Sequence, residues 1–450
     1  MKLTTKYRFA NRFNRPDSVV VIASFPGKTD RSIREIDAVA SYTDHFTRSF
    51  RKELDKDGRK LVIIAQKIKG EEAWYEEKGM LVVRVWDKGS PLAFVQILAA
   101  LHFLGNIGAI LVQFEFHQFG GLLTTALFPA FLALLRLTGK HVTLVLHQVV
   151  EDITSLSGHV DVAKGSRKAL LFNAALRGFY LAVSGIAHTI IVHNAYLKTR
   201  LARMTGRADA IVIPHGLGAI KGRISKREAR RRLGYKPGDK VILSFGFLTW
   251  YKGSDWLVKQ VAGMKRKNVK LLMAGGPSPN LADRPHYKTF LRRITEDATD
   301  NPNIQITGFV NDRDIPMYFA AADLVVLPYR ALMSSSGPLA MTIAFTKPFI
   351  VSKALKPYSS DEDFRLAMTV AGVDADTLTF ALNTTSFRQS YTHALKHTKG
   401  LTKLSKLLKE SRLWHQVAAR FAAVIPTQDY AGRRTFAIMG GGVPISYAHT

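Results

Sequence analysis

Val241-Ile242-Leu243-Ser244-Phe245-Gly246 is followed, after five intervening residues, by Lys252-Gly253-Ser254-Asp255-Trp256-Leu257-Val258. The first run is short, aliphatic and β-branched and ends in a glycine, which is typical of a buried strand and its turn. The second places a Lys-Gly pair before an apolar helical pattern. The sequence therefore predicts one βα unit here.

The same alternation continues on both sides of this unit. Short apolar runs precede it at residues 18–23, 61–65, 81–85, 109–113, 142–146, 189–192 and 210–213, and follow it at 269–274, 304–307, 324–327 and 349–352. Helical stretches separate these runs, and this alternation predicts parallel βαβ units. The fold class is therefore α/β with parallel sheets.

Chain length indicates two domains. A chain of 450 residues exceeds what one core supports, and 47% apolar residues suffice for two. Pro214-His215-Gly216 separates the two series of runs. We expect a basic N-terminal arm (1–17), an N-terminal Rossmann-like acceptor-side domain (18–216), a C-terminal Rossmann-like domain (217–425) and a C-terminal tail (426–450).

Composition restricts location and chemistry. The absence of cysteine excludes disulfides and thiolate chemistry and fits a cytoplasmic protein. The basic first 15 residues are followed by no apolar segment, so we expect a solvated arm and no secretory signal. Residues 120–135 are the most apolar stretch but are shorter than the about 20 residues of a membrane span. They predict a buried crossover helix.

The formal net charge of +29 implies an anionic partner. A membrane surface, a nucleic acid and an acidic substrate all satisfy it, and a solvated basic face is an equal alternative for basic clusters such as that in residues 221–232. No nucleic-acid-binding module is present, so we expect no specific nucleic-acid partner.

Glycines follow several runs at the strand ends where open α/β sheets bind ligands. They are Gly27, Gly246, Gly275 and Gly276. A glycine lets backbone N–H groups approach a phosphate, and a helix N-terminus adds a favourable dipole. Each turn alone could equally be an ordinary loop. Lys252 adds an ammonium group where a diphosphate would lie.

A polar loop before another apolar helix is a further candidate. It consists of Ser335, Ser336 and Gly337, followed by Pro338 and Leu339. Such a loop offers N–H groups and hydroxyls to a phosphate or a ribose. Capping of the helix by a serine is the simpler role, and both roles are compatible.

Polar residues after two runs of the first half could act on a sugar. His147 follows residues 142–146, and Glu115 and His117 follow 109–113. These side chains can hydrogen-bond a sugar or polarise a leaving group, although a histidine after a strand is often structural. No Asp-x-Asp motif is present, and the histidines lie on separate strands, so we expect no metal.

In order along the chain, several segments resemble family 4 of the retaining glycosyltransferases, a GT-B group that transfers sugars from nucleotide diphosphates. Residues 113–121, QFEFHQFGG, are similar to a QHEFGIFGG segment of one subgroup, and residues 212–216 read VIPHG. The second half contributes YKGSD at 251–255, AGG at 274–276 and SSG at 335–337. The resemblance covers residues 18–425 and implies two facing Rossmann-like domains with an interdomain cleft.

The resemblance also implies roles. Lys252 would contact the diphosphate of a GDP- or UDP-linked donor, the amides of 335–339 would line the donor site, and His147 would approach the transferred sugar, with Glu115 and His117 on the acceptor side. The reaction would be a retaining, metal-independent and cofactor-free transfer of a mannose- or glucose-type hexose. The acceptor would be a lipid-linked saccharide or polysaccharide at the inner face of the membrane.

Two departures from the family raise an alternative. Met333 and Met341 occupy the positions of two glutamates that family members commonly carry, and Phe247 replaces a frequent arginine. A catalytically silent GT-B protein that binds a nucleotide sugar or a partner enzyme is therefore the second hypothesis.

Overall fold

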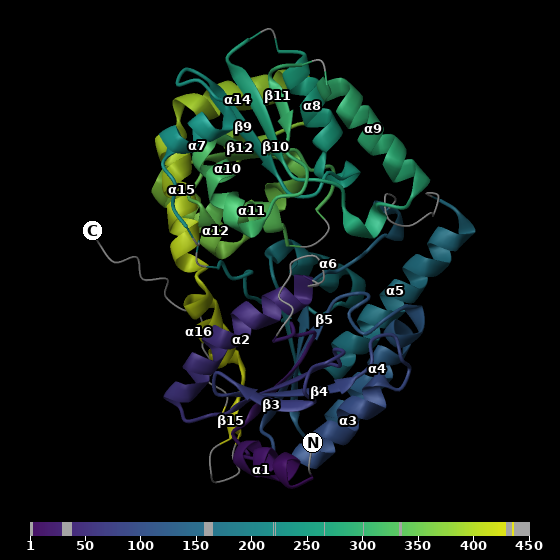
Figure 1. Cartoon of the computed structure of the whole chain (residues 1–450). Helices are drawn as coiled ribbons and strands as arrows, with labels where there is room; N and C mark the ends of the chain where they lie inside the picture. The colour runs from purple at the N-terminus through teal and green to yellow at the C-terminus, as the bar shows by residue number, and fades with distance from the viewer. Residues whose placement is uncertain are drawn as a thin grey trace. The chain divides into compact units, whose positions relative to one another are not determined.

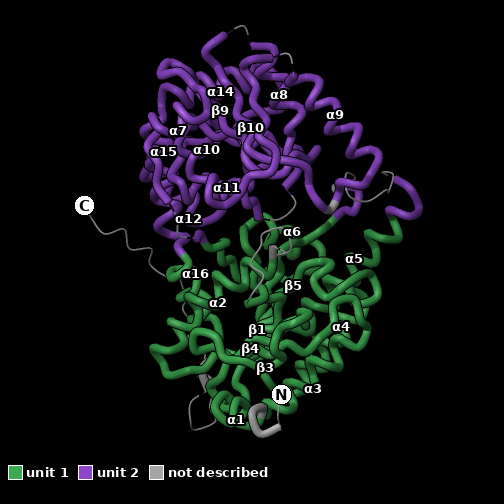
Figure 2. Tube along the Cα trace, in the orientation of Figure 1, with its two compact units in different colours: residues 1–151, 170–216, 414–450 green, residues 152–169, 217–413 purple. Residues whose placement is uncertain are grey.

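The computed structural model describes residues 3–28, 38–156, 165–218, 220, 222–264, 266–299, 301–332, 335–428 and 434–435. The chain forms two compact units (Figure 2). The first contains residues 1–151, 170–216 and 414–450, and the second contains residues 152–169 and 217–413.

The first unit is built on an eight-stranded sheet of order β3-β4-β2-β1-β5-β6-β7-β8. All neighbouring strands are parallel except the edge pair β3 and β4. The strands are β1 (Val19–Ile22), β2 (Leu61–Gln66), β3 (Trp74–Glu77), β4 (Met80–Trp86), β5 (Ala109–Phe114), β6 (His141–Leu146), β7 (Thr189–Val192) and β8 (Ile211–Val212).

Helices cover both faces of this sheet. Because successive strand residues point to opposite faces, Val20 and Ile22 join one core cluster while Val19 and Val21 join the other. The first cluster lies under α1 (Leu3–Phe13), α3 (Ala93–Leu104), α4 (Leu122–Leu137), α5 (Arg167–Ile186) and α6 (Ala195–Thr205). The second lies under α2 (Ala38–Lys56) and α16 (Trp414–Val424).

Two predictions about the helices of the first unit are wrong. The N-terminal residues are not a solvated arm: α1 buries Ala10 and Phe13, and the Tyr7 ring lies 5.2 Å from Phe103 of α3. Residues 120–135 do contribute a crossover helix, α4, but it is not buried throughout, because five of its leucines are exposed.

The second unit contains a six-stranded parallel sheet of order β11-β10-β9-β12-β13-β14. In chain order this is 3-2-1-4-5-6, the strand order of the Rossmann fold. The strands are β9 (Lys240–Phe245), β10 (Val269–Ala274), β11 (Ile304–Ile306), β12 (Leu324–Leu327), β13 (Phe349–Ser352) and β14 (Thr379–Phe380). The α/β class with parallel sheets is confirmed for both units (Figure 1).

α-Helices and short 3₁₀ helices surround the second sheet. The α-helices are α7 (Lys226–Leu233), α8 (Ser254–Ala262), α9 (Pro285–Thr299), α10 (Ile315–Ala321), α11 (Gly337–Ala344), α12 (Glu362–Ala371), α13 (Ala375–Leu378), α14 (Thr384–Lys396) and α15 (Thr398–Ser411). The 3₁₀ turns of the chain are η1 (Ile153–Leu156), η2 (Trp250–Lys252), η3 (Pro279–Leu281), η4 (Asp312–Asp314) and η5 (Lys353–Ser360).

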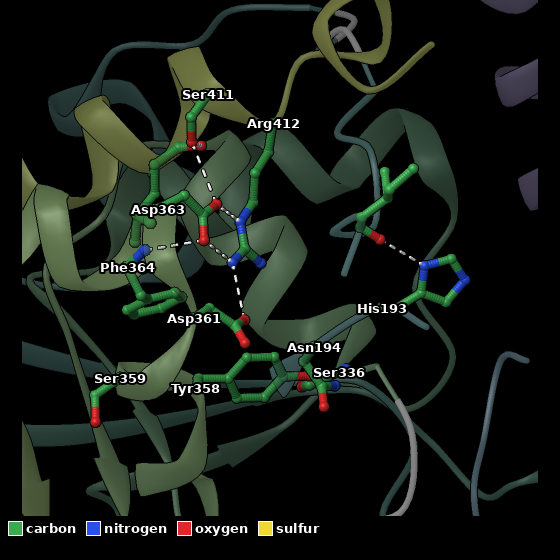
Figure 3. A network of polar contacts seen from close by, with 12 residues as sticks. His193, Asn194, Ser336, Tyr358, Ser359, Asp361, Asp363, Phe364, Ser411 and Arg412 are labelled. Atoms are coloured by element: carbon green, nitrogen blue, oxygen red, sulfur yellow. Dashed lines mark hydrogen bonds and ion pairs between the residues drawn. The ribbon is translucent and has the colours of Figure 1, made fainter. Parts of the chain in front are cut away.

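A buried ion pair joins the residue that follows α15 to the start of α12 in the second unit. The guanidinium of Arg412 donates to both carboxylate oxygens of Asp363, at 2.5 and 2.8 Å, and to Asp361 at 3.3 Å (Figure 3). These contacts raise the pKa of Arg412 despite its burial. The charge-assisted bonds hold the end of α15 against the start of α12.

The predicted end of the second domain at residue 425 is wrong. After Arg412 the chain returns to the first unit, where α16 packs on α2: the Trp414 ring lies 5.2 Å from Tyr42, and the Phe421 ring lies 4.6 Å from Phe46. Of the predicted tail, β15 (Thr427–Gln428) and β16 (Arg434–Thr435) pair antiparallel. Residues 429–433 and 436–450 lie outside the described residues.

Candidate functional site

In the second unit, a tight turn after β9 positions Lys252. Gly253 follows η2 with φ 72°, and a Cβ at this residue would lie 2.0 Å from the carbonyl oxygen of Pro328. Both the left-handed conformation and the close approach require glycine. The start of α8 is thereby fixed against the chain that leaves β12.

Lys252 is partly buried, and its ammonium has no anionic partner among the described residues. A Cβ on Gly246 would lie 3.1 Å from both Lys252 Nζ and Pro338 Cγ, so the turn after β9, η2 and the start of α11 converge here. Burial lowers the pKa of Lys252 to about 8. A desolvated cation without a counter-ion is unfavourable, so the group is suited to an anionic ligand.

An ion pair between Arg330 and Asp255, which the sequence did not predict, holds this turn. Arg330 donates to both oxygens of Asp255, at 2.7 and 2.9 Å, and to the Trp250 carbonyl at 2.6 Å. Its guanidinium lies 4.9 Å from the centroid of the Trp250 ring. The only signal in the sequence was an acidic residue in the first turn of a helix. The bidentate geometry ties α8 and η2 to the segment after β12.

Gly275 and Gly276 allow close backbone packing. A Cβ on Gly275 would lie 2.0 Å from the Gly246 carbonyl oxygen, and one on Gly276 would lie 2.8 Å from the Phe309 nitrogen. These glycines support the Gly246 turn beside Lys252. Their predicted contact with a donor stays a prediction.

The serine loop before α11 is bonded within the protein. The Ser336 amide donates to the Tyr358 hydroxyl at 2.9 Å (Figure 3). Ser336 Oγ accepts from the Leu339 amide at 3.2 Å. Pro338 has no N–H. The capping role is therefore observed, and the amides of Ser336 and Leu339 are engaged, contrary to the prediction that they face a donor. For the Gly337 amide and for Ser335, contact with a donor stays a prediction.

Of the two methionines that stand at the expected glutamate positions, only Met341 belongs to the described residues. Met341 lies in α11 and is partly buried. Met333 and the adjacent Ser334 lie outside the described residues.

In the first unit, hydrogen bonds connect His147 to the ends of three strands. His147 Nε2 lies 2.9 Å from Gln113 Oε1, His147 Nδ1 lies 3.2 Å from His193 Nε2, and His193 Nδ1 lies 3.0 Å from the Ile213 carbonyl. These residues come from the carboxyl ends of β5, β6 and β7, where ligands of such sheets bind.

This chain of bonds has one direction when both imidazoles are neutral. His193 must donate from Nδ1 to the carbonyl, so its Nε2 accepts from His147 Nδ1, which leaves His147 Nε2 as an acceptor. The Gln113 amide nitrogen, which is buried without a partner among the described residues, becomes the donor to that atom if the two ends of the amide exchange places.

Aromatic rings and burial keep the imidazoles neutral. The Tyr42 ring lies 4.7 Å from His147 and 4.9 Å from His215. Burial, with the neighbouring histidines, lowers the pKa of His147 well below its usual value, and burial lowers the pKa of His193 to about 3. Both ring nitrogens of His147 are engaged, by Gln113 and by His193. The predicted role of polarising a leaving group as an acid therefore does not fit, and the predicted contact of His147 with a sugar stays a prediction.

The other candidates of the first unit lie in turns. Glu115 is partly buried, and His117 is exposed with φ 71° in the turn after β5. At Gly27, the following amide of Lys28 donates to the Glu71 carboxylate at 2.8 Å. A carboxylate at this turn repels a phosphate, so the structure opposes the predicted donor contact of Gly27. The described residues contain no cluster of three potential metal ligands.

Residues 239–384 match the family model described as glycosyl transferases group 1. This matched segment lies within the second unit. The matched segment includes Gly246, Lys252 and Ser336, and this match supports the predicted transferase activity.

Curated relatives match over a shorter segment. An uncharacterized glycosyltransferase of Methanocaldococcus jannaschii is 30% identical over 100 residues, which are 22% of this chain. The match spans only 24% of that relative's length.

Solved structures match over nearly the whole chain. Sucrose-phosphate synthase from Thermosynechococcus elongatus superposes with a TM-score of 0.63 at 14% identity, covering 90% of this chain and 97% of its own. HepE from Anabaena, solved with UDP, gives a TM-score of 0.57 at 14% identity and coverages of 90% and 98%. At these identities the likeness shows the fold alone, and the GT-B fold is confirmed.

Proposed function

We propose that the chain transfers a hexose from a nucleotide-diphosphate sugar and that Lys252 binds the diphosphate. The observation that carries this proposal is the partly buried ammonium beside Gly246 and Pro338, which has no anionic partner among the described residues and lies in the segment that matches the group 1 model. A diphosphate would supply the missing counter-charge. Positive charge at this place would also stabilise the leaving diphosphate as the sugar departs.

A UDP-linked glucose-type donor is the first choice, with a GDP-linked mannose-type donor as the alternative. HepE was solved with UDP and with UDP-glucose, which supports a uridine donor. The transfer is proposed as retaining, cofactor-free and metal-independent, as the resemblance to family 4 implies. His147 would contact the transferred sugar by exchanging its Nε2 bond with Gln113 for one from a sugar hydroxyl.

The proposed acceptor is a lipid-linked saccharide or a polysaccharide at the inner face of the membrane. The net charge of +29 supports an anionic surface as a partner. A catalytically silent protein that binds a nucleotide sugar or a partner enzyme is the second candidate, and the non-ionisable Met341 in α11 favours it.

Calorimetric titration of the full chain with UDP, GDP and their glucose and mannose conjugates tests the binding step. Release of nucleoside diphosphate with membrane extracts as acceptors then tests turnover. Saturable binding with turnover supports the transferase. Binding with no release on any extract favours the silent protein. No binding of either nucleotide refutes the transferase and leaves only a silent protein that binds a partner enzyme.

A further inference from the structure

The outward face of α4 is apolar along its whole length. Leu123, Leu127, Ala130, Leu134 and Leu137 are exposed, and their spacing of four, three, four and three residues places them on one side of a helix. Leu137 keeps 81% of its surface exposed. The opposite side buries Phe128, Phe131, Leu132 and Leu135 in the core. This helix therefore presents a second apolar face that the described residues leave uncovered.

Helix α5 continues this surface. Leu170, Leu171 and Leu181 are exposed, and the helix has the length and hydropathy of a membrane span, with only 22% of its most apolar window buried. It nevertheless packs along the unit, since Tyr180 is fully buried and the Phe179 ring lies 6.2 Å from Phe128 of α4. A helix anchored in this way is suited to lie on a membrane rather than cross it.

Further contacts place these helices side by side. Arg136 at the end of α4 donates to the Ile186 carbonyl at the end of α5, at 2.7 Å, and the Phe94 ring of α3 lies 4.5 Å from Phe131. Figure 1 shows α3, α4 and α5 as neighbours in the first unit. We call the exposed leucines of the two longer helices the leucine face: Leu122, Leu123, Leu127, Leu134, Leu137, Leu170, Leu171 and Leu181.

The charge around the leucine face has one sign. The sequences of α3, α4 and α5 contain no Asp or Glu, while Arg136, Arg167, Lys168 and Arg177 are exposed. A second copy of this chain would bring the same cations against them at a net charge of +29 on each molecule. An anionic bilayer offers both hydrocarbon for the leucines and negative headgroups for the cations.

We propose that the leucine face docks the protein on an anionic lipid bilayer, with α4 and α5 lying in the interface. The inference deepens the proposed function, on which it rests for the acceptor, because a lipid-linked acceptor would then be reached from the docked first unit. The leucines enter the acyl boundary, and Arg167, Lys168 and Arg177 contact headgroups.

Flotation of the full chain with vesicles tests the docking. The probes are phosphatidylcholine vesicles and vesicles with 30% phosphatidylglycerol, in low and high salt. We expect binding to the anionic vesicles that falls with salt. Leu134→Ser with Leu171→Ser should weaken it by roughly 100-fold, because two large side chains lose their apolar burial. The matched control is Leu366→Ser with Val370→Ser, two exposed apolar residues of α12.

Equal binding of the leucine variant and the wild type overturns the proposal, as does wild-type binding that is absent or independent of lipid charge. A wild-type dimer that the leucine variant abolishes, without vesicle binding, would assign the face to self-association and also overturn it. UDP titration without vesicles separates the two proposals. Loss of UDP binding in Lys252→Ala supports the donor site whatever the vesicles show, and unchanged melting temperatures exclude misfolding of the leucine variant.

Discussion

At the scale of single residues, the proposed donor binding depends on the charge of the Lys252 ammonium. Lys252→Ala removes a charge-assisted phosphate contact and should weaken UDP binding by about 1.5–3 kcal/mol. Lys259→Ala, which changes an exposed lysine in the last turn of the same helix α8, is the control and should leave the affinity unchanged. Calorimetric titration measures both. An unchanged affinity in Lys252→Ala would remove this residue from the site.

The lowered pKa of Lys252 makes donor binding sensitive to pH. In the proposed site the diphosphate would bind the protonated ammonium, whose pKa is about 8 without the ligand. The affinity for UDP should therefore be constant below about pH 7 and fall by up to roughly tenfold per pH unit above 8, until the higher pKa of the occupied site is reached. Titrations from pH 6.5 to 9.5 measure this.

Lys252→Arg provides the control for this profile, because a guanidinium stays protonated throughout the range. Its profile should be flat over the same interval. A wild-type profile that is equally flat would contradict the assignment of the titrating group.

His147 should affect turnover more than donor binding. His147→Ala removes a neutral hydrogen-bonding group and should lower turnover by roughly 100-fold with a small change in UDP affinity. The exposed His286→Ala of α9 serves as the control. Initial rates of nucleotide release measure the effect, and a wild-type rate in His147→Ala would refute the role.

At the scale of elements, the turn between η2 and α8 determines where Lys252 lies. Gly253→Ala adds a Cβ 2.0 Å from the Pro328 carbonyl oxygen at φ 72°, so it should lower the free energy of unfolding by more than about 1 kcal/mol and weaken UDP binding. Gly263→Ala, at the other end of α8 with φ −77°, is the matched control and should be nearly neutral. Urea unfolding compares them. Equal stabilities would show that the turn tolerates a side chain.

At the scale of the whole molecule, the buried histidines predict acid sensitivity of the first unit. The pKa of His193 is about 3 in the fold and about 6.5 in the unfolded chain, so the unfolded state binds the extra proton as pH falls. The unfolding free energy should drop by about 2 kcal/mol from this residue between pH 7 and pH 5. Hydrogen exchange of β6 and β7 amides measures it in the first unit.

His193→Gln should flatten this pH dependence, and the exposed His286→Gln should not. A slope in His193→Gln that matches the wild type would mean that other groups control the acid sensitivity. The comparison uses exchange rates from the same strands, so a separate transition of the second unit does not enter it.

Both sheets follow from local pattern. Short β-branched runs between helices determine parallel strands, and glycine after β9 with Lys252-Gly253 before α8 determines a turn that offers cationic and backbone groups. These features depend on neighbours in the sequence, so the α/β class and the place of Lys252 beside the Gly246 turn could be predicted, and the contact of Lys252 with a donor stays a prediction. The short strands β3 and β14 were missed because their few residues carry little pattern.

Long-range contacts decided the rest. The return of α16 to the first unit depends on Trp414 packing against Tyr42, which lies far away in the sequence. The Glu71 carboxylate at the Gly27 turn and the His193 bond to His147 likewise join distant strands. Residues 120–135 show the limit most clearly: composition determines that α4 is apolar on every side, but only the packing of the sheet against one side decides that the other stays exposed.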